Sequence, residues 1–519
     1  MTRLLKRSST HTYAESADDR SSEGSSEGSS EGELEKNQED SDEFQFFHEL
    51  KSLTVIALPT VGIQAFTMLL YPLTASFIGR NYTSEDFGAY SLASMTGNLT
   101  LVSLMIGMMS ANETLQPRSF GLKQYREVGL LAVRGFIICL VLMVPFTLAF
   151  VFWGNEIFFW LLGEQPQQAQ DNLGASNEEI ANLAGSWMKV YLGSVISQLL
   201  FRSVFRISAC QQVDALLPLL YGVILTSVIF HPIALQLTAA IFGFLGTAVA
   251  ISLSFTVICL VSLLLIRVMK VHEVQIWPCW PIQEWSTVST FLQDALQWDD
   301  ILKFTKLGLG GVLALTYWWF WESMTLISGK IGMTSLCAHT VAYQMIPILF
   351  MIPLGISIGL SNRIGKILPV RVNKAKQLVF YTMIFTIVLG GFISIFFYKY
   401  RVFLISIFTK DEHVTALCES FWSDAAIVVF LIFAFGCSAG VHRALGIQWR
   451  MAVIIVLALW IVGQPLMVHI CLYNGGGVVA MYRILKWLFG IMDVLLILSF
   501  TSVNWQDISD SINENEGKL

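Results

Sequence analysis

Long apolar stretches separated by short polar segments recur along the chain from residue 53 to residue 502. A helix needs about 20 mostly apolar residues to cross the roughly 30 Å of hydrocarbon in a bilayer. About twelve stretches have this length, so the pattern predicts a polytopic α-helical membrane protein. The predicted spans are 53–79, 89–111, 128–153, 184–208, 214–235, 238–268, 304–329, 334–361, 378–398, 421–445, 451–473 and 477–502.

The composition agrees with a chain that lies mostly in lipid. Of the 519 residues, 54% are hydrophobic and 13% are charged, and the mean hydropathy is +0.61. These values exclude an ordinary soluble globular protein. The eight cysteines include no CxxC pair and show neither zinc-site nor disulfide-framework spacing. We therefore expect no metal site, no cofactor and no nucleic-acid partner. We expect most of the chain to be surrounded by the lipid bilayer.

Residues 1–44 have a different character from the rest of the chain. They contain the repeat SSEGSSEGSSEG and almost no large apolar side chains. Such a segment cannot bury enough surface to offset the entropy of ordering it. We predict a disordered, acidic, cytoplasmic tail. No apolar run closely follows the first methionine, so the first span, rather than a cleaved signal peptide, is expected to direct insertion.

Lysine and arginine concentrate in the gaps that follow the even-numbered spans. Arg118 and Arg126 follow the second span, and Arg363 and Lys366 follow the eighth. Basic loops remain on the cytoplasmic side of a membrane, so both termini are predicted to be cytoplasmic. The plasma membrane and the vacuolar membrane both stay open as locations.

The two halves of the chain repeat one another. Aligning IGMMSANETLQPRSFGLKQYREV with LGISIGLSNRIGKILPVRVNKAK pairs Gly107 with Gly355 and Arg118 with Lys366 without a gap. Many transporters are built from two such repeats around a cavity. We therefore predict an all-α membrane protein of two pseudo-symmetric six-helix lobes. The expected parts are an N-terminal lobe at 45–270, an amphipathic cytoplasmic connector at 271–300, a C-terminal lobe at 301–503 and a cytoplasmic tail at 504–519.

Glu322 is a lone carboxylate in the aromatic stretch TYWWFWESMTLISG of the seventh span. A charge at the bilayer centre costs about 2.5–3.5 kcal/mol on insertion scales, so such acids usually face a cavity and take part in transport. A proton and a bound organic cation would compete for this carboxylate. That competition is the minimal requirement for exchanging one for the other.

The last span offers an alternative partner for Glu322. It contains Arg483, Lys486 and Asp493. At 1.5 Å per residue from the outer face, Glu322 lies about 10–12 Å deep and Arg483 about 9 Å deep. A standing ion pair between them is therefore the alternative to a free carboxylate. Asp493 is a second titratable candidate, unless Lys486 or solvent is its partner, and Asp424 is expected to be solvated near the outer end of its helix.

Several motifs taken together resemble one known family. TYWWFWESMTLISG is followed by CAHTVAYQMIPILFMIPLGISIGLSNRIG, and ANETLQPRSFG, HRALGIQ and VGQP occur in order elsewhere. This set resembles the multidrug and toxic compound extrusion (MATE) transporters in their eukaryotic form. The resemblance implies a fold of two lobes that rock around a central cavity. It also implies export of organic cations or other amphipathic solutes in exchange for protons or, less often, sodium.

The resemblance also points to residues of the transport site. Trp318 is expected either to stack on flat or cationic solutes or to pack against lipid or a neighbouring helix. Gln64 and Tyr343 match polar cavity positions, although an interhelical hydrogen bond explains either one equally well. The chain departs from the family at several of its usual acids. Tyr317 and Gln344 stand at two of those positions. A cavity with fewer acids should favour neutral or anionic solutes more than its relatives do. Ile432 and Thr74 stand at two further acidic positions.

Three functions remain open at this stage. We expect a monomeric secondary antiporter that exports organic cations, drugs or other amphipathic solutes in exchange for protons by rocker-switch alternating access. The alternatives are a flippase for lipids or lipid-linked substrates, and a sodium-coupled exporter of a neutral or anionic metabolite. A membrane enzyme would need paired acids or a histidine–aspartate motif. The sequence contains neither pattern, so we do not expect an enzyme.

Overall fold

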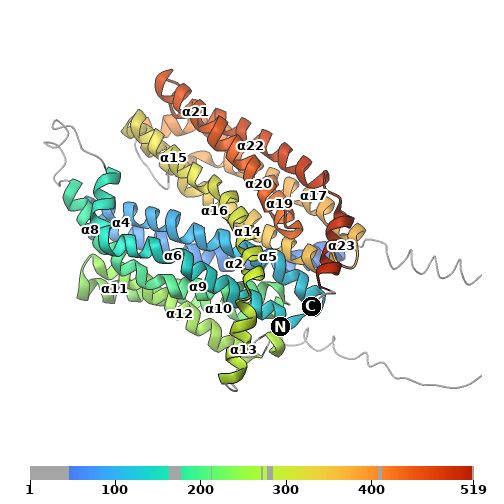
Figure 1. The fold of residues 1–519 in the computed structure, drawn as a ribbon. Helices are drawn as coiled ribbons and strands as arrows, with labels where there is room; N and C mark the ends of the chain where they lie inside the picture. Colours follow the sequence, from blue (N-terminus) through green and yellow to red (C-terminus); the bar gives the residue numbers. More distant parts are fainter. Residues whose placement is uncertain are drawn as a thin grey trace, which may run out of the picture. The chain divides into compact units, whose positions relative to one another are not determined.

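The computed structural model describes residues 46–162, 177–211, 213–270, 273–276, 285–406 and 412–516, and this part of the chain is helical with no strand (Figure 1). Eleven of its helices are long and apolar enough to cross a membrane. The remaining predicted span, 304–329, consists of two shorter helices separated by Leu315 alone. The predicted all-α membrane fold is therefore confirmed. The acidic tail predicted at 1–44 lies outside the described residues.

Several spans consist of two helices joined by a short π or 3₁₀ turn. In the N-terminal half the helices are α2 (Phe46–Met68), α3 (Leu70–Asn81), α4 (Ser84–Gly97), α5 (Ser103–Gly121), α6 (Tyr125–Leu162), α8 (Asn177–Tyr191), α9 (Val195–Cys210), α10 (Leu217–Ile224), α11 (His231–Phe242) and α12 (Leu245–Met269). In the C-terminal half they are α14 (Trp298–Ala314), α15 (Thr316–Ile331), α16 (Met333–Ile367), α17 (Val372–Lys399), α18 (Arg401–Ser406), α19 (Glu412–Leu445), α20 (Gln448–Ile455), α21 (Gln464–Met467) and α22 (Gly477–Thr501).

Local sequence explains where several helices begin and end. Thr83 caps α4 through a capping box, in which its hydroxyl accepts from the Asp86 backbone and the Asp86 carboxylate accepts from the Thr83 backbone. Gly446 lies between α19 and α20 at φ +74°, a left-handed conformation that suits glycine. It also leaves room for Arg118, whose guanidinium would lie 3.2 Å from a Cβ at this position.

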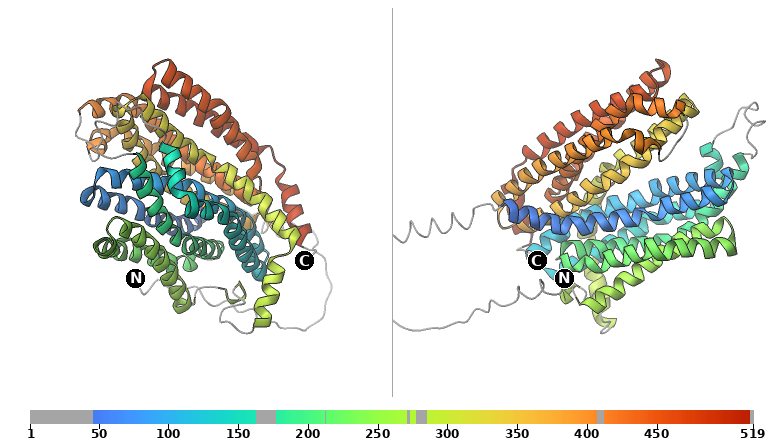
Figure 2. Two further views of the ribbon diagram at one scale, coloured as in Figure 1. Left: turned by 60° about the vertical axis from the view of Figure 1, so that its left-hand side comes forward. Right: turned by 180° about the vertical axis from the view of Figure 1, so that it is seen from behind.

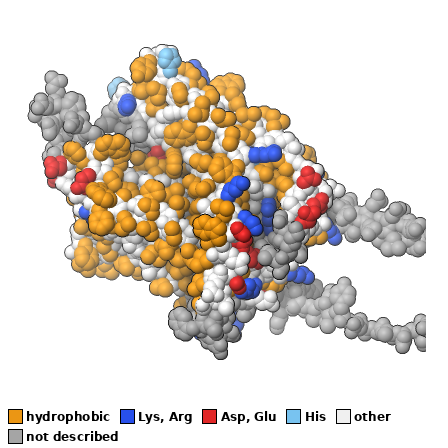
Figure 3. All heavy atoms as spheres, in the orientation of Figure 1, with side chains coloured by type: hydrophobic (Ala, Val, Ile, Leu, Met, Phe, Trp, Pro, Cys, Tyr) orange, Lys and Arg blue, Asp and Glu red, His pale blue; other side chains and the backbone are white. Residues whose placement is uncertain are grey.

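The outer surface is apolar, as a lipid-facing surface must be. Side chains such as Trp160, Phe392 and Leu498 are more than half exposed. Figure 3 shows apolar side chains over most of the visible face, with lysine, arginine, aspartate and glutamate mainly towards its two ends, including a group near α23 and α13. The charged loops thus lie outside the apolar region, where water can solvate them.

The two halves pack closely through glycines. In the right-hand view of Figure 2 the blue and green helices form one group and the yellow to red helices another. Between them α2 packs against α16, and α5 packs against α14 and α16. A Cβ on Gly107 would lie 2.5 Å from the Val312 Cα, and one on Gly355 would lie 2.9 Å from the Val61 backbone nitrogen. Small residues at these crossings let the helix backbones approach each other, as in other membrane proteins.

Contacts across this interface agree with the predicted repeat. Ser361 Oγ donates to the Glu113 carbonyl at 3.2 Å, and these two residues are 248 positions apart. The shift that aligns Gly107 with Gly355 pairs the same two residues, and it pairs Pro117 with Gly365, which are also in contact. Equivalent residues of two repeats touch each other only near the pseudo-twofold axis. The axis therefore passes between α5 and α16, close to Glu113.

Two further helices cover the end of the bundle near this axis, which we call the closed end and define by Glu113, Pro117, Gly365 and Arg443. Helix α13 (Trp285–Ala295) lies in the predicted connector, and Arg134 Nε donates to the Ala295 carbonyl at 2.9 Å. Helix α23 (Trp505–Glu516) lies in the predicted C-terminal tail. Ser509 Oγ donates to the Leu368 carbonyl at 3.0 Å, which fastens α23 to the end of α16.

The geometry of this interface predicts that a disulfide can be engineered between α2 and α16. A Cβ on Gly359 would lie 3.6 Å from the Ala57 Cβ, within the 3.5–4.5 Å typical of disulfides. Ala57→Cys/Gly359→Cys should therefore crosslink under mild oxidation with little backbone movement. Mass spectrometry of a digest should find the linked peptides of α2 and α16. Each single cysteine variant is the control, and failure of the pair to crosslink would contradict the described packing of α2 on α16.

Candidate functional site

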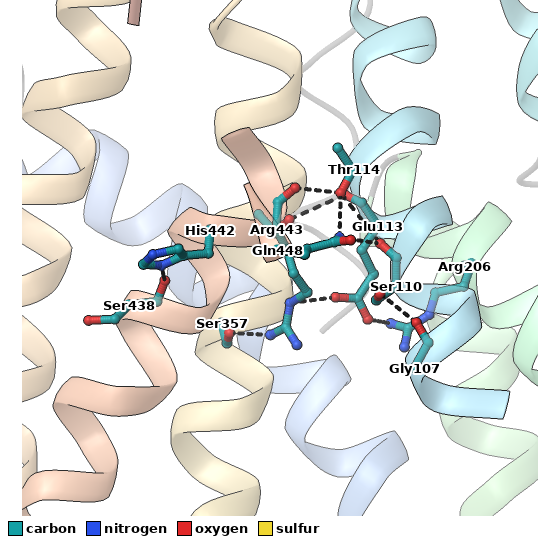
Figure 4. Close-up of polar contacts among 11 residues, drawn as sticks. Gly107, Ser110, Glu113, Thr114, Arg206, Ser357, Ser438, His442, Arg443 and Gln448 are labelled. Atoms are coloured by element: carbon teal, nitrogen blue, oxygen red, sulfur yellow. Dashed lines mark hydrogen bonds and ion pairs between the residues drawn. The ribbon is translucent and has the colours of Figure 1, made fainter. Parts of the chain in front are cut away.

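Three charged side chains meet at the closed end, between the two halves. Glu113 in α5 pairs with Arg206 in α9 through one carboxylate oxygen and with Arg443 in α19 through the other, with 2.7 Å between Arg443 Nε and Glu113 Oε2. Glu113 and Arg206 are 4% and 5% exposed. Figure 4 shows the carboxylate lying between the two guanidinium groups. Two of the charges belong to the N-terminal half and one to the C-terminal half, so this charge trio holds the halves together.

Hydrogen bonds surround the charge trio and also cross between the halves. Thr114 Oγ1 donates to the Arg443 carbonyl at 2.5 Å, and Gln448 Nε2 donates to Thr114 Oγ1 at 2.9 Å (Figure 4). Arg118 Nη2 donates to the Ala444 carbonyl at 2.6 Å. These bonds satisfy backbone and side-chain groups at a helix end that would otherwise be buried without partners. They form only when α5 and α19 are in contact.

The sequence analysis did not identify Glu113, Arg206 or Arg443 as functional residues. The predicted second span ended at residue 111, whereas α5 continues to Gly121 and keeps Glu113 buried. A signal was present in the repeat. A shift of 237 positions brings Arg206 onto Arg443 and Gln211 onto Gln448, because R-x₄-Q occurs in both VFRISACQ and VHRALGIQ. This shift is 11 positions shorter than the 248 that aligns Gly107 with Gly355, so the two arginines correspond between the repeats once a gap is allowed, and the acid between them lies near the axis.

Glu322 lies behind the wall of an aromatic pocket in the C-terminal half. The Tyr343 hydroxyl donates to Glu322 Oε1 at 2.5 Å, and Tyr343 lines a pocket together with other aromatic side chains. Glu322 is 8% exposed. No lysine or arginine among the described residues lies within ion-pair distance of it. The other lining residues include Tyr317, Trp318, Trp321, Phe350, Phe435 and Phe489.

The structure brings only part of the predicted site together. Tyr317 and Trp318 line the aromatic pocket with Tyr343, and the Tyr317 ring stands edge-on to Phe435 at 4.8 Å. Gln64 is buried in α2 of the opposite half. The backbone of Gln344 belongs to α16, but its side chain is outside the described part of the molecule.

Tyr317, Phe350 and Phe435 also line a second pocket. Ser110 of α5 and Arg443 of α19 contribute to its lining. This second pocket therefore lies between the two halves, directly against the charge trio, and it shares an aromatic wall with the pocket of the C-terminal half. A solute in the space between the halves would meet both the aromatic wall and the polar closed end.

The alternative pairing of Glu322 with Arg483 is wrong. The Arg483 side chain is 66% exposed and its Nε lies 3.9 Å from Asp424 Oδ2. It shares the outer face of α22 with Trp487, Ile491 and Val494, which are also more than half exposed. Counting residues along a helix estimates the depth of a side chain, but depth does not determine which face of the helix that side chain occupies.

Two further charge assignments need correction for the same reason. Asp424 is 7% exposed rather than solvated, and Lys486 Nζ lies 2.5 Å from its Oδ1. Lys486 is therefore the partner of Asp424 and not of Asp493. Asp493 is 4% exposed, and neither of its carboxylate oxygens has a hydrogen-bond partner within the described ranges. It lies on the same face of α22 as Phe489, which is one turn away and lines the aromatic pocket.

A family model and a curated relative place the chain among known proteins. The MatE family model matches residues 59–235 and 311–468, which is more than half of the chain. Multidrug and toxin extrusion protein 1 of Oryctolagus cuniculus is 24% identical over 450 residues, which cover 84% of this chain and 72% of that protein. The match extends over both halves and over the segments that carry Glu113, Glu322 and Arg443.

Solved structures share the fold. The crystal structure of the eukaryotic MATE transporter AtDTX14 superposes with a TM-score of 0.75 at 19% identity, covering 91% of this chain and 99% of that one. A MOP superfamily transporter from Pyrococcus furiosus, for which reverse polarity of the binding pocket suggests a different function, superposes with a TM-score of 0.68 at 16% identity, covering 89% and 96%. Those MATE structures have the same two-lobe arrangement of helices.

The charge trio predicts a specific effect of Arg443→Gln. This change removes the link between the halves but leaves Glu113 paired with Arg206, so the fold should persist while contact at the closed end weakens. Losing one partner of a buried pair costs about 3–5 kcal/mol. A cysteine placed at the buried Ser110 should then react with N-ethylmaleimide at least about tenfold faster than in the parent.

Arg126→Gln is the matched control for this experiment. Arg126 pairs with Asp294 at the surface, where its side chain is 56% exposed, and such pairs contribute about 0–1 kcal/mol. Arg126→Gln should leave the labelling rate of the cysteine at position 110 unchanged. Equal labelling rates in Arg443→Gln and the parent would show that the charge trio does not hold the halves together.

Proposed function

The chain belongs to the MatE family, and from this membership we propose that it exports amphipathic organic solutes in exchange for protons by alternating access. It is an integral, multi-pass membrane transporter and not an enzyme. The observation that carries the proposal is the buried Glu322, hydrogen-bonded by Tyr343 directly behind the aromatic pocket. The coupling ion, the chemical class of the solute and the monomeric state all belong to this proposal.

The setting of Glu322 suits a carboxylate that exchanges protons. A permanent cationic partner would hold it ionised, and the described part of the chain supplies none. Its recorded hydrogen bond comes from Tyr343, a wall residue of the pocket. A solute that displaces the Tyr343 ring therefore also disturbs the carboxylate, which links occupation of the pocket to binding of the proton. Proton and solute need not occupy the same point to compete.

Asp493 supports a second proton-binding position. An ionised carboxylate buried without hydrogen bonds or a counter-charge is costly. We propose that Asp493 holds a proton in this conformation and releases it when water reaches this part of α22. The two acids lie in different helices of the same half, and both lie next to residues of the aromatic pocket.

The pocket supports an aromatic or otherwise flat solute. Its lining is almost entirely aromatic and aliphatic, and stacking and cation–π contacts give affinity without requiring a single shape. Pocket polarity differs among structurally similar transporters, as the protein from P. furiosus illustrates. The fold therefore does not decide between cationic, neutral and anionic solutes, and the charged groups near the cavity must be considered instead.

The closed end supports alternating access, because the two halves are in contact there and would have to separate to open this side. The basic residues of this end, including Arg118 and Lys366, lie where cytoplasmic loops are expected, so we propose that the described conformation is sealed towards the cytoplasm. Separating the halves at the charge trio would then admit solute from the cytoplasm. We propose that the working unit is a monomer, in the plasma membrane or the vacuolar membrane.

Glu322→Gln should abolish transport driven by a pH gradient. The amide cannot release a proton but keeps the size of the side chain and can still accept from Tyr343. In proteoliposomes, efflux of a radiolabelled aromatic solute under an imposed pH gradient should fall to the rate of protein-free vesicles. Glu419→Gln, which changes an exposed acid of α19, is the matched control and should transport normally. Undiminished pH-driven flux in Glu322→Gln, or flux that follows a sodium gradient instead, would contradict the proposed coupling.

The engineered disulfide provides an independent test of alternating access. With the crosslink between positions 57 and 359 formed, the halves cannot separate at the closed end, so transport should stop and should recover after reduction with dithiothreitol. The same proteoliposome assay measures both states. Each single cysteine variant should stay active under oxidising conditions. Full activity of the crosslinked protein would rule out separation of α2 from α16 during transport.

A further inference from the structure

Helix α9 carries a second arginine that the charge trio does not use. Arg202 lies one turn before Arg206 on the same face of the helix. The lipid-facing side of α9 is marked by Ile196 and Leu200, which are 60% and 38% exposed. At about 100° per residue, Arg202 lies roughly on the opposite side of the helix from both. Its side chain therefore points into the N-terminal half and not towards lipid.

Arg202 is nevertheless only partly buried, whereas Arg206 is fully buried. Part of the surface of this inward-pointing side chain therefore stays accessible. Its five N–H donors make no recorded hydrogen bond or ion pair with any described residue. Glu113, the acid of the charge trio, is already occupied by Arg206 and Arg443. Arg202 is thus a positive charge that the surrounding structure does not compensate.

Two tyrosines and a glutamine lie beside this charge. The hydroxyls of Tyr71 and Tyr191 are 2.9 Å apart, and Gln198 Nε2 donates to the Tyr191 hydroxyl at 3.1 Å. Arg202 lies near both tyrosines. Gln198 lies one turn before Arg202 on the same face of α9. Its side-chain Oε1 is buried without a hydrogen-bond partner. The site therefore combines a guanidinium with hydroxyl groups and aromatic surface.

A neutral or cationic ligand would leave such an arginine unpaired, and an unpaired charge within a membrane is costly. A carboxylate or sulfonate fits the guanidinium, because its two oxygens can accept a pair of parallel N–H donors. We propose that Arg202, with Tyr71 and Tyr191, binds the anionic group of an amphipathic organic acid. This inference rests on the proposed export of amphipathic solutes and specifies their class.

The two halves then contribute different chemistry. The acidic, proton-binding residues lie in the C-terminal half, and the anion-binding arginine lies in the N-terminal half, with Tyr191 stacked on Trp187 at 5.2 Å beside it. The aromatic rings around Tyr191 offer a surface for the apolar part of the same solute. Substrate charge and coupling proton are held at separate places in this arrangement.

Equilibrium binding tests the site without any gradient. Purified protein in detergent is titrated with 2-naphthoate, with 2-naphthylmethylammonium and with inorganic phosphate by calorimetry. The parent should bind 2-naphthoate more tightly than the matched cation. Arg202→Gln should weaken 2-naphthoate binding at least about tenfold, while Arg202→Lys, which keeps the charge but not the paired donors, should fall between the two. Binding of phosphate in preference to 2-naphthoate would overturn the organic-acid assignment in favour of a phosphate head group.

Arg483→Gln is the matched control, since it removes the intramembrane arginine that points outwards. It should bind 2-naphthoate like the parent. Tyr71→Phe deletes one hydroxyl and should weaken binding modestly even if Arg202→Gln proves unstable in a melting assay. The titration imposes no gradient, so a loss of pH-driven transport in Glu322→Gln neither supports nor overturns this assignment. Equal affinity of the parent, Arg202→Gln and Tyr71→Phe for 2-naphthoate, or equal affinity of the parent for the anion and the cation, overturns the proposal.

Discussion

The arrangement of the molecule depends on one carboxylate that must stay dry. Glu113 is shared by an arginine from each half near the pseudo-twofold axis, and its attraction to them is strong because water is excluded. Breaking such a pair inside the protein costs several kcal/mol. If the halves separate, water enters and solvates all three charges, which removes much of that cost. Intermediate states, in which the ion pair is broken but its charges are not yet hydrated, are the least favourable.

The glycine contacts between α2, α5, α14 and α16 also disfavour intermediate states, because packing at such close distances is either complete or lost. Together they favour two discrete conformations over a continuous range.

Pseudo-symmetry and asymmetry have different places in the structure. At the axis the repeats contribute equivalent residues, as the pairs Arg206 with Arg443 and Glu113 with Ser361 show. Away from the axis the halves have diverged. The C-terminal half contains an aromatic pocket bordered by Glu322 and Asp493, and the N-terminal half contains Arg202 among tyrosines. A common origin thus accounts for the contact between the lobes, whereas the residues proposed to bind the solute and the coupling proton each belong to one half.

Hydropathy and repeat analysis predicted the helical fold well, because crossing a bilayer imposes a length and a composition that are visible in the sequence alone. Glu322 was also recognisable from the sequence, because a carboxylate is unusual in a span of this composition. Partnerships between helices were not predictable, since residue counting gives depth but not direction around the helix axis. Arg483 has the depth expected of a partner for Glu322 but faces outwards. Glu113 was missed because ANETLQPRSFG is polar enough to look like the start of a loop, while tertiary contacts from α9, α16 and α19 supply its partners and keep it inside α5.

The charge trio also has an electrical consequence. Its net charge is +1 while it is closed. When the halves part, Glu113 remains neutralised by Arg206 on one side, and Arg443 is left alone on the other. The newly opened mouth then carries a bare positive charge at its rim. A charged entrance raises the local concentration of ions of opposite sign and repels those of like sign. If the halves separate during transport, as proposed, this contact would therefore favour the approach of anions over cations at the entrance.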